Sequence, residues 1–142
     1  MKSSIIIMLF IALCSTASFA ETPSDNSMSE RAKAKTVSRL YQATYGSSER
    51  CKKATPDANL EFQNELNHFV EVKANLMKLI TQSPYYDSAV KQFSEFGAVD
   101  PERDTPEMLA SECKYLALTL RSMIDTPEGK NAAKEFEDLL SK

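Results

Sequence analysis

The chain has 142 residues, of which 17 are basic, 20 are acidic and one is histidine, so its formal net charge at pH 7 is −3. Nucleic-acid-binding domains carry a clustered basic face, which this mildly acidic composition does not predict, so we expect no nucleic-acid partner. Only three glycines are present, too few for the glycine-rich loops that hold phosphate groups or expose a nucleophile. We therefore predict neither an enzyme nor a bound cofactor.

Residues 1–20 have the pattern of a signal peptide. Lys2 precedes an apolar run from Ile5 to Leu13, and small and polar residues follow as far as Ala20. As a helix, this run would span about 14 Å, too short for the ~30 Å hydrocarbon core of a bilayer. Cys14 raises the alternative of a lipoprotein, but the bulky Leu13 before it disfavours lipidation. We expect cleavage after Ala20 and a mature chain without a stable membrane anchor, in the periplasm of a Gram-negative bacterium or otherwise secreted.

Cleavage would leave 122 residues, enough for one domain with its own core. The removed segment holds one lysine and no acid, so 16 basic and 20 acidic residues remain and the net charge becomes −4. It also removes Cys14, which leaves Cys51 and Cys113. An even pair in an oxidising compartment predicts one disulfide. A redox-active pair is the alternative, but such cysteines usually lie close together in the sequence.

The mature chain is expected to start with a flexible tail over residues 21–29, because this segment is polar and lacks periodicity. A single helical domain over residues 30–142 follows. Its first helix is predicted from about Ser29 to Thr44, closing near Gly46, with Cys51 in the connector after it. Residues 36–45 could also pass for a strand, but a lone strand would have no partner, so we prefer the helix.

Four later positions place a hydroxyl residue directly before a proline. The hydroxyl can cap a helix, and proline is tolerated at the first helical position because its missing N–H would be unpaired there anyway. Apolar residues then recur at helical spacing after each pair. These signals predict helices over roughly 57–81, 83–97, 106–124 and 126–140, and the pairs are Thr55-Pro56, Ser83-Pro84, Thr105-Pro106 and Thr126-Pro127.

The prediction is therefore an all-α fold, a compact five-helix bundle stapled by one disulfide. The helices over 57–81 and 106–124 are expected to form its spine. Cys113 lies on the apolar face of the fourth predicted helix, so a bond to Cys51 would pin the first helix and its connector to the middle of the bundle.

An acidic loop between the third and fourth predicted helices is a candidate recognition surface. Asp100, Glu102 and Asp104 stand at alternate positions, as at the start of a calcium loop. That loop needs a glycine at its sixth position and a glutamate at its twelfth, where this chain has Thr105 and Ser111. We therefore expect no calcium site, but a solvated linker that could contact a basic partner.

Other side chains offer less specific signals. His68 is the only histidine, and with both cysteines in a disulfide too few ligands remain for a zinc site, so we predict a surface histidine and no metal. Tyr85 and Tyr86 cannot both face one core stripe, so at least one is expected to be partly exposed, as in many interfaces. Tyr41 and Tyr45 carry the same ambiguity.

These observations favour a small secreted binding protein that docks to another protein, for example an inhibitor or an immunity protein against a secreted toxin. A carrier of a small apolar ligand or lipid is the alternative, and it predicts surplus apolar volume inside the bundle. A stress or chaperone-like protein that exposes apolar surface at low pH is a third hypothesis. The sequence does not indicate the oligomeric state.

Overall fold

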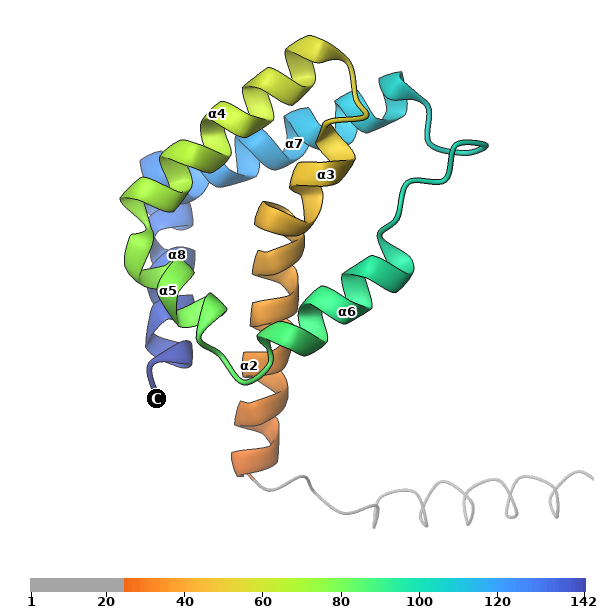
Figure 1. The fold of residues 1–142 in the computed structure, drawn as a ribbon. Coiled ribbons are helices and arrows are strands. Elements are labelled where there is room, and N and C mark those ends of the chain that lie inside the picture. The colour runs from red at the N-terminus through yellow and green to blue at the C-terminus, as the bar shows by residue number, and fades with distance from the viewer. Residues whose placement is uncertain (1–24) are drawn as a thin grey trace, which may run out of the picture. The chain divides into compact units, whose positions relative to one another are not determined.

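The computed structural model describes residues 25–142, which are 82% helical and contain no strand. The predicted signal peptide and residues 21–24 of the predicted tail lie outside this range. In chain order the elements are α2 (Asp25–Tyr41), the π-helix η1 (Gln42–Gly46), α3 (Ser47–Cys51), α4 (Pro56–Val72), α5 (Ala74–Thr81), α6 (Tyr86–Phe96), α7 (Pro106–Asp125) and α8 (Pro127–Leu140) (Figure 1). The chain divides into two structural units between Arg31 and Ala32, and the architecture below is that of residues 32–142.

The first helix is longer than the sequence predicts. It begins at Asp25 rather than near Ser29, and α2, η1 and α3 follow one another without interruption as far as Cys51. The prediction that this helix closes near Gly46 was wrong, because the backbone there widens into a π-helical turn instead of ending. The hydroxyl of Ser47 donates a 2.5 Å hydrogen bond to the Gln42 carbonyl five residues back, which supports this wider turn. Cys51 consequently lies at the end of a helix and not in a connector.

Helices α4 and α7 form the predicted spine and run in parallel. Lys114 pairs with Asp57 at 3.3 Å, and further along both helices Arg121 pairs with Glu65 at 2.5 Å and with Glu61 at 3.8 Å. Since these partners occur in the same order on both helices, the two helices point the same way. Figure 1 shows α4 and α7 side by side.

The described residues form six helices where the sequence predicts five, when α2, η1 and α3 are counted as one. The additional helix arises because the predicted helix over 57–81 bends at Lys73, whose φ and ψ are −107° and 35°. Helix α4 packs on α7 and α5 packs on α8. The bend at Lys73 therefore matches the corner at Thr126 between α7 and α8, so that α4 stays packed on α7 and α5 on α8.

The hydroxyl–proline pairs mark helix starts at three of their four positions. Helices α4, α7 and α8 begin at the prolines, and the threonine hydroxyls before α7 and α8 accept hydrogen bonds from Met108 N at 3.2 Å and Gly129 N at 3.0 Å. The Ser83-Pro84 pair forms a turn instead, in which Ser83 Oγ accepts from Tyr85 N at 3.2 Å. Helix α6 accordingly starts at Tyr86.

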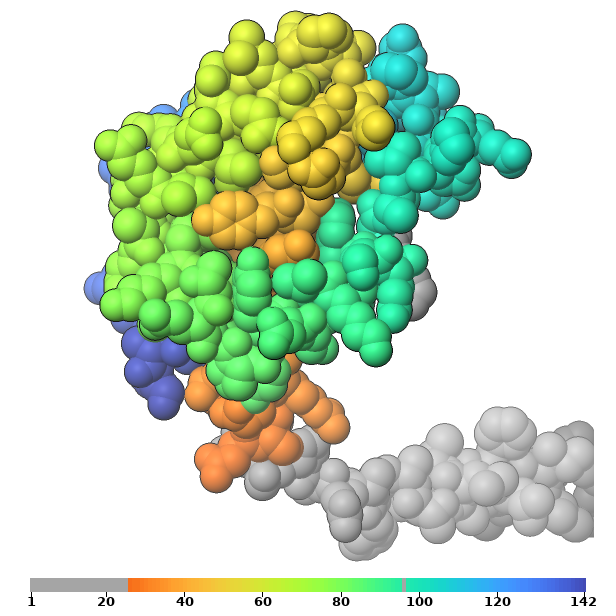
Figure 2. Space-filling model, in the orientation of Figure 1, coloured from red at the N-terminus to blue at the C-terminus, as the bar shows by residue number. Residues whose placement is uncertain are grey.

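The hydrophobic core lies between the spine, α5, α8 and the first helix. Its largest fully buried side chains come from the predicted apolar stripes and include Phe62, Phe69, Leu76, Ile80, Leu109, Leu120 and Val37. Helix α6 contributes the buried Ala89 and packs mainly on η1. Figure 2 shows α6 and the loop after it, in green to teal, beside the orange and yellow first helix. None of the helices within residues 25–142 is long and apolar enough to cross a membrane.

Candidate functional site

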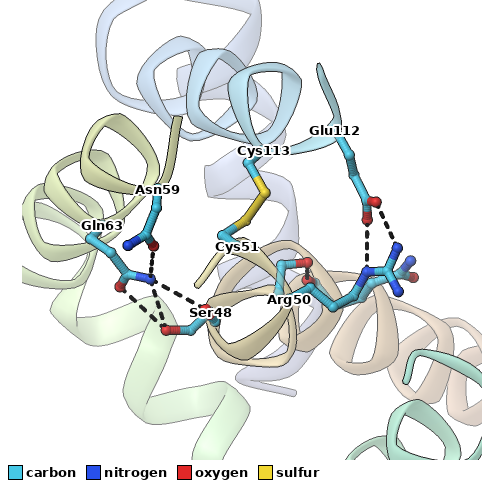
Figure 3. The surroundings of a disulfide bond; sticks show 9 residues. Ser48, Arg50, Cys51, Asn59, Gln63, Glu112 and Cys113 are labelled. Atoms are coloured by element: carbon cyan, nitrogen blue, oxygen red, sulfur yellow. Dashed lines mark hydrogen bonds and ion pairs between the residues drawn. A yellow bond between two sulfur atoms is a disulfide. The ribbon is translucent and has the colours of Figure 1, made fainter. Parts of the chain in front are cut away.

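Cys51 and Cys113 meet where α3 contacts α7. Their Sγ atoms lie 2.13 Å apart, at disulfide distance, and their Cα atoms lie 5.8 Å apart (Figure 3). Both residues are fully buried. The bond therefore joins the end of the first helix to the middle of the spine, which is the pairing that the sequence predicts.

Polar links flank the disulfide on both sides (Figure 3). On one side, Gln63 Nε2 donates to the carbonyl and the hydroxyl of Ser48, at 3.3 and 3.2 Å. On the other, Arg50 donates from Nε and Nη2 to the two carboxylate oxygens of Glu112, at 3.2 and 2.8 Å. Hydrogen bonding to Glu112 is the main reason that the pKa of Arg50 is raised above its ordinary value. Because Arg50 and Glu112 each precede a bridged cysteine, the ionic and covalent links hold the same two turns together.

Arg50 also holds the loop between α6 and α7. Its Nη1 donates to the carbonyl of Gly97 at 3.0 Å and lies 3.5 Å from the Asp104 carboxylate. The Asp104 side chain is only 8% exposed, and it accepts a 2.9 Å hydrogen bond from Asp100 N. That bond, followed by the Arg103 side chain, holds the pKa of Asp104 below its ordinary value of 3.8. Of the predicted recognition acids, Asp104 thus serves to anchor the loop.

The other two predicted acids remain exposed on the same loop. Asp100 Oδ1 accepts a 3.0 Å hydrogen bond from Glu102 N, which shapes the turn. The structure thus brings Asp100, Glu102 and Asp104 together in one loop, with only the first two presented to solvent.

The predicted tyrosines lie at the start of α6, where Tyr86 joins an aromatic cluster. The ring of Tyr41 makes edge-on contacts with Tyr86, at a centroid distance of 5.5 Å, and with Phe93, at 5.9 Å. Burial, followed by the nearby Tyr41 and Tyr45, raises the pKa of Tyr86. Tyr85 is half-buried and lines a neighbouring cleft between α2 and α6. Tyr41 and Tyr45, which the sequence left ambiguous, therefore belong to the same region.

Beside this cluster lies a surface cleft of about 370 Å³, which we call the aromatic cleft. Its apolar wall consists of Tyr41, Tyr45, Phe93 and Val99, and its polar rim includes Glu49 and Lys53. The wall comes from the end of α2, η1, α6 and the loop that Arg50 anchors. An apolar wall with a few polar groups around it is the usual composition of a binding site.

Two of the three glycines allow the aromatic cleft to form. A Cβ on Gly46 would lie 3.1 Å from the Tyr41 ring and 3.2 Å from the Phe93 ring, and a Cβ on Gly97 would lie 2.7 Å from the Phe93 ring. From the sequence, both glycines are expected only as helix ends. Gly46 follows Tyr41 by five residues and Gly97 follows Phe93 by four, so each glycine lies about one helical turn after an aromatic residue. This spacing is the one signal in the sequence that could have indicated an aromatic site, and it is a weak one.

His68 is exposed on α4. Within residues 25–142, no cluster of three or more histidine, cysteine, aspartate or glutamate side chains is arranged to hold a metal ion. The residues described by the structure therefore offer the aromatic cleft and its surroundings, rather than a metal centre, as the candidate site.

No family model matches the chain, and no similar protein was found among curated proteins or solved structures.

Proposed function

We propose that this chain is a small secreted binding protein that docks to another protein through the aromatic cleft. The observation that carries the proposal is the cleft itself, in which Tyr41, Tyr45 and Phe93 present apolar surface beside a polar rim. Tyrosine and phenylalanine are enriched at protein interfaces because they offer a large contact area at a low cost in conformational entropy. An inhibitor or an immunity protein would act by docking of this kind.

The construction of the cleft supports the proposal. The disulfide and the Arg50–Glu112 pair fix α3 on the spine, while Arg50 also holds the end of α6 and the following loop. A binding surface that is ordered before contact loses less conformational entropy on binding. The signal-peptide pattern and the disulfide both suit an oxidising compartment outside the cytosol, where we place the protein.

A carrier of apolar ligands would be expected to hold its cargo within the bundle. The clefts described here instead lie at the surface along the first helix and α6. The large core side chains Phe62, Phe69 and Leu120 are fully buried against one another and their neighbours. We therefore favour docking of a protein over carriage of a lipid.

Selection of random peptides displayed on phage, with the purified protein as bait, tests the proposal and does not require an identified partner. We expect enriched peptides that bind the wild-type protein and lose at least about tenfold in affinity for Tyr45→Ala. Tyr115→Ala is the matched control, because Tyr115 is 70% exposed on α7 and lines none of the described clefts. It should leave binding unchanged.

The proposal fails if no peptide is enriched, or if the enriched peptides bind Tyr45→Ala as well as they bind the wild type. Circular dichroism of both variants shows whether each is folded. Native mass spectrometry of the protein from its secreting host provides a second test, since a stoichiometric lipid would support the carrier instead.

A further inference from the structure

The aromatic cleft is one of three adjoining clefts. A second cleft, of about 220 Å³, shares Phe93 and Gly97 with it. A third, of about 320 Å³, shares Ser38 and Gln92 with the second and extends to Lys35 and Arg39. Together they follow the first helix from Lys35 to its end at Cys51 and the turn after it as far as Lys53, with α6 as the opposite wall. We call these three clefts the α2–α6 groove.

The groove is positively charged, although the protein as a whole is acidic. Lys35, Arg39 and Lys53 are exposed along it, and none of them has an ion-pair partner within residues 25–142. The acid that lines it, Glu49, is already paired with Lys52. Arg50 contributes no free charge, since Glu112 and Asp104 occupy its guanidinium. Cations therefore stand near both ends of the groove, with Lys35 and Arg39 at one end and Lys53 on the rim of the aromatic cleft at the other.

The middle of the groove carries neutral polar groups. Gln42 and Gln92 are exposed there, and the Gln92 carbonyl oxygen accepts a 3.3 Å hydrogen bond from Ser38 Oγ across the groove. The amide NH₂ groups of both glutamines are thus available as donors within the described part of the chain. An extended peptide has unpaired main-chain carbonyls that such donors can bind, whereas the carbonyls of a helix are already paired. The exposed Ser38–Gln92 bond is one that a peptide main chain can replace.

From these features we infer that the α2–α6 groove binds an extended acidic segment of a partner protein. One aromatic or large aliphatic side chain of the segment enters the aromatic cleft, and carboxylates on either side of it pair with Lys35 and Arg39 and with Lys53. From Lys35 to Cys51 the helix spans about 24 Å at ~1.5 Å per residue, and together with the turn to Lys53 this is a length that about eight extended residues would cover. This inference rests on the proposed function and adds the chemistry of the partner.

Two synthetic peptides of about eight residues test the inference by fluorescence anisotropy. The first has a central tryptophan and two aspartates at each end, and the second has asparagines in place of the aspartates. We expect the acidic peptide to bind the wild-type protein at least about tenfold more tightly than the neutral one, and less tightly as salt is added. Lys35→Glu/Arg39→Glu and Lys53→Glu should each weaken its binding by about tenfold or more.

The matched control for the charge reversals is Lys130→Glu/Lys134→Glu. Both lysines are exposed on α8 and line none of the three clefts, so this variant should bind the acidic peptide like the wild type. If the control weakens binding as much as the groove variants do, net charge alone governs the interaction and the inference fails.

Failure of the inference and failure of the proposed function give different results. If the enriched peptides are neutral or basic and their binding depends on Tyr45, the inference that the bound segment is acidic fails, while the proposal of docking through the aromatic cleft stands. A complete lack of peptides that depend on Tyr45 would overturn both. Binding to vesicles of anionic lipid or to single-stranded DNA, if lost in Lys35→Glu/Arg39→Glu while the acidic peptide does not bind, would assign the groove to a different class of ligand and overturn the inference.

Discussion

The Arg50 side chain contacts three parts of the domain that are distant in sequence: Glu112 on α7, the Gly97 carbonyl at the end of α6, and Asp104 in the following loop. Arg50→Ala removes all of these contacts, and we expect it to lower the free energy of unfolding by about 2 kcal/mol, as for hydrogen bonds between charged groups at a partly exposed site. Urea denaturation followed by circular dichroism measures the change.

Arg50→Lys separates charge from geometry. Lysine keeps the positive charge but cannot donate two parallel hydrogen bonds to the Glu112 carboxylate. We therefore expect the free energy of unfolding of Arg50→Lys to lie between that of the wild type and that of Arg50→Ala. Amide hydrogen exchange over residues 98–104 should be faster in both variants than in the wild type. Equal stability of Arg50→Lys and wild type would show that charge alone holds the loop.

Asp104 should make stability depend on pH in the acidic range. Its pKa in the folded protein lies below the ordinary value of 3.8, so its ionised form stabilises the fold at pH values above 3.8. This contribution disappears as the pH falls through the lowered pKa. Asp104→Asn keeps an acceptor for Asp100 N but removes the charge that faces Arg50 and Arg103.

We therefore expect Asp104→Asn to be less stable than the wild type from about pH 5 to pH 7, and the difference to shrink below about pH 4. Thermal unfolding of both proteins across this range measures the difference. Other carboxylates affect both proteins alike, so the comparison isolates Asp104. A difference that is the same at pH 3 as at pH 7 would contradict the role assigned to its charge.

The candidate site was only partly predictable at the level of residues. Once the pattern over residues 1–20 is interpreted as a signal peptide, two cysteines remain and admit one pairing, so the disulfide could be predicted by counting. The roles of the loop acids did not, because the partner of Asp104 is Arg50, which lies 54 residues earlier in the chain. The aromatic cleft depends on a similar long-range meeting of Tyr41 and Phe93. Composition and spacing carry no signal for such contacts between distant segments.

Among the elements, the corner between α7 and α8 shows that crowding can outweigh helix propensity. Gly129 lies in the first turn of α8, where alanine would normally favour the helix by about 1 kcal/mol. A Cβ there would overlap the Ser122 carbonyl and lie 2.7 Å from Met123 N, both of which are main-chain groups that cannot turn aside. We therefore expect Gly129→Ala to destabilise the protein by about 2 kcal/mol.

Lys130→Ala is the matched control, since Lys130 is the next residue of α8 and is exposed. It should change the midpoint of urea unfolding little. If Gly129→Ala were as stable as this control, the two helices would not approach as closely as the structure indicates.

The helix starts and the bend at Lys73 differ in how far the sequence could reveal them. Thr105-Pro106 and Thr126-Pro127 determine their helix starts locally, through a capping hydroxyl and a proline, and both were predicted correctly. Lys73 has no glycine or proline next to it, and Lys73 N still donates to the Phe69 carbonyl at 2.8 Å. The bend is imposed by packing of α5 on α8, which a local pattern cannot report. The helical extension through Gly46 was missed because glycine near the end of an apolar pattern predicts a helix end, whereas here the backbone widens into a π-helical turn.

For the whole domain, the disulfide is the link with the longest reach. It closes a loop between residues 62 positions apart, and this loop contains all of α4, α5 and α6. Closing a loop of this length restricts the unfolded chain and is expected to stabilise the fold by about 4 kcal/mol. Small domains commonly have a free energy of unfolding of only about 5–15 kcal/mol, so the bond accounts for a large share of it.

We expect Cys51→Ser/Cys113→Ser to lose about 4 kcal/mol in urea denaturation and to keep its helical circular dichroism at low temperature, because the apolar core and the Arg50–Glu112 pair remain. Wild-type protein that is unfolded, reduced and refolded under reducing conditions should match the variant. Because both cysteines are fully buried, a mild reductant should open the bond in the native protein only as the domain unfolds. Rapid reduction of the folded protein, trapped by alkylation and seen by mass spectrometry, would show instead that α3 separates from α7 independently of global unfolding. The aromatic cleft, whose walls depend on that junction, would then be a mobile surface rather than one fixed before binding.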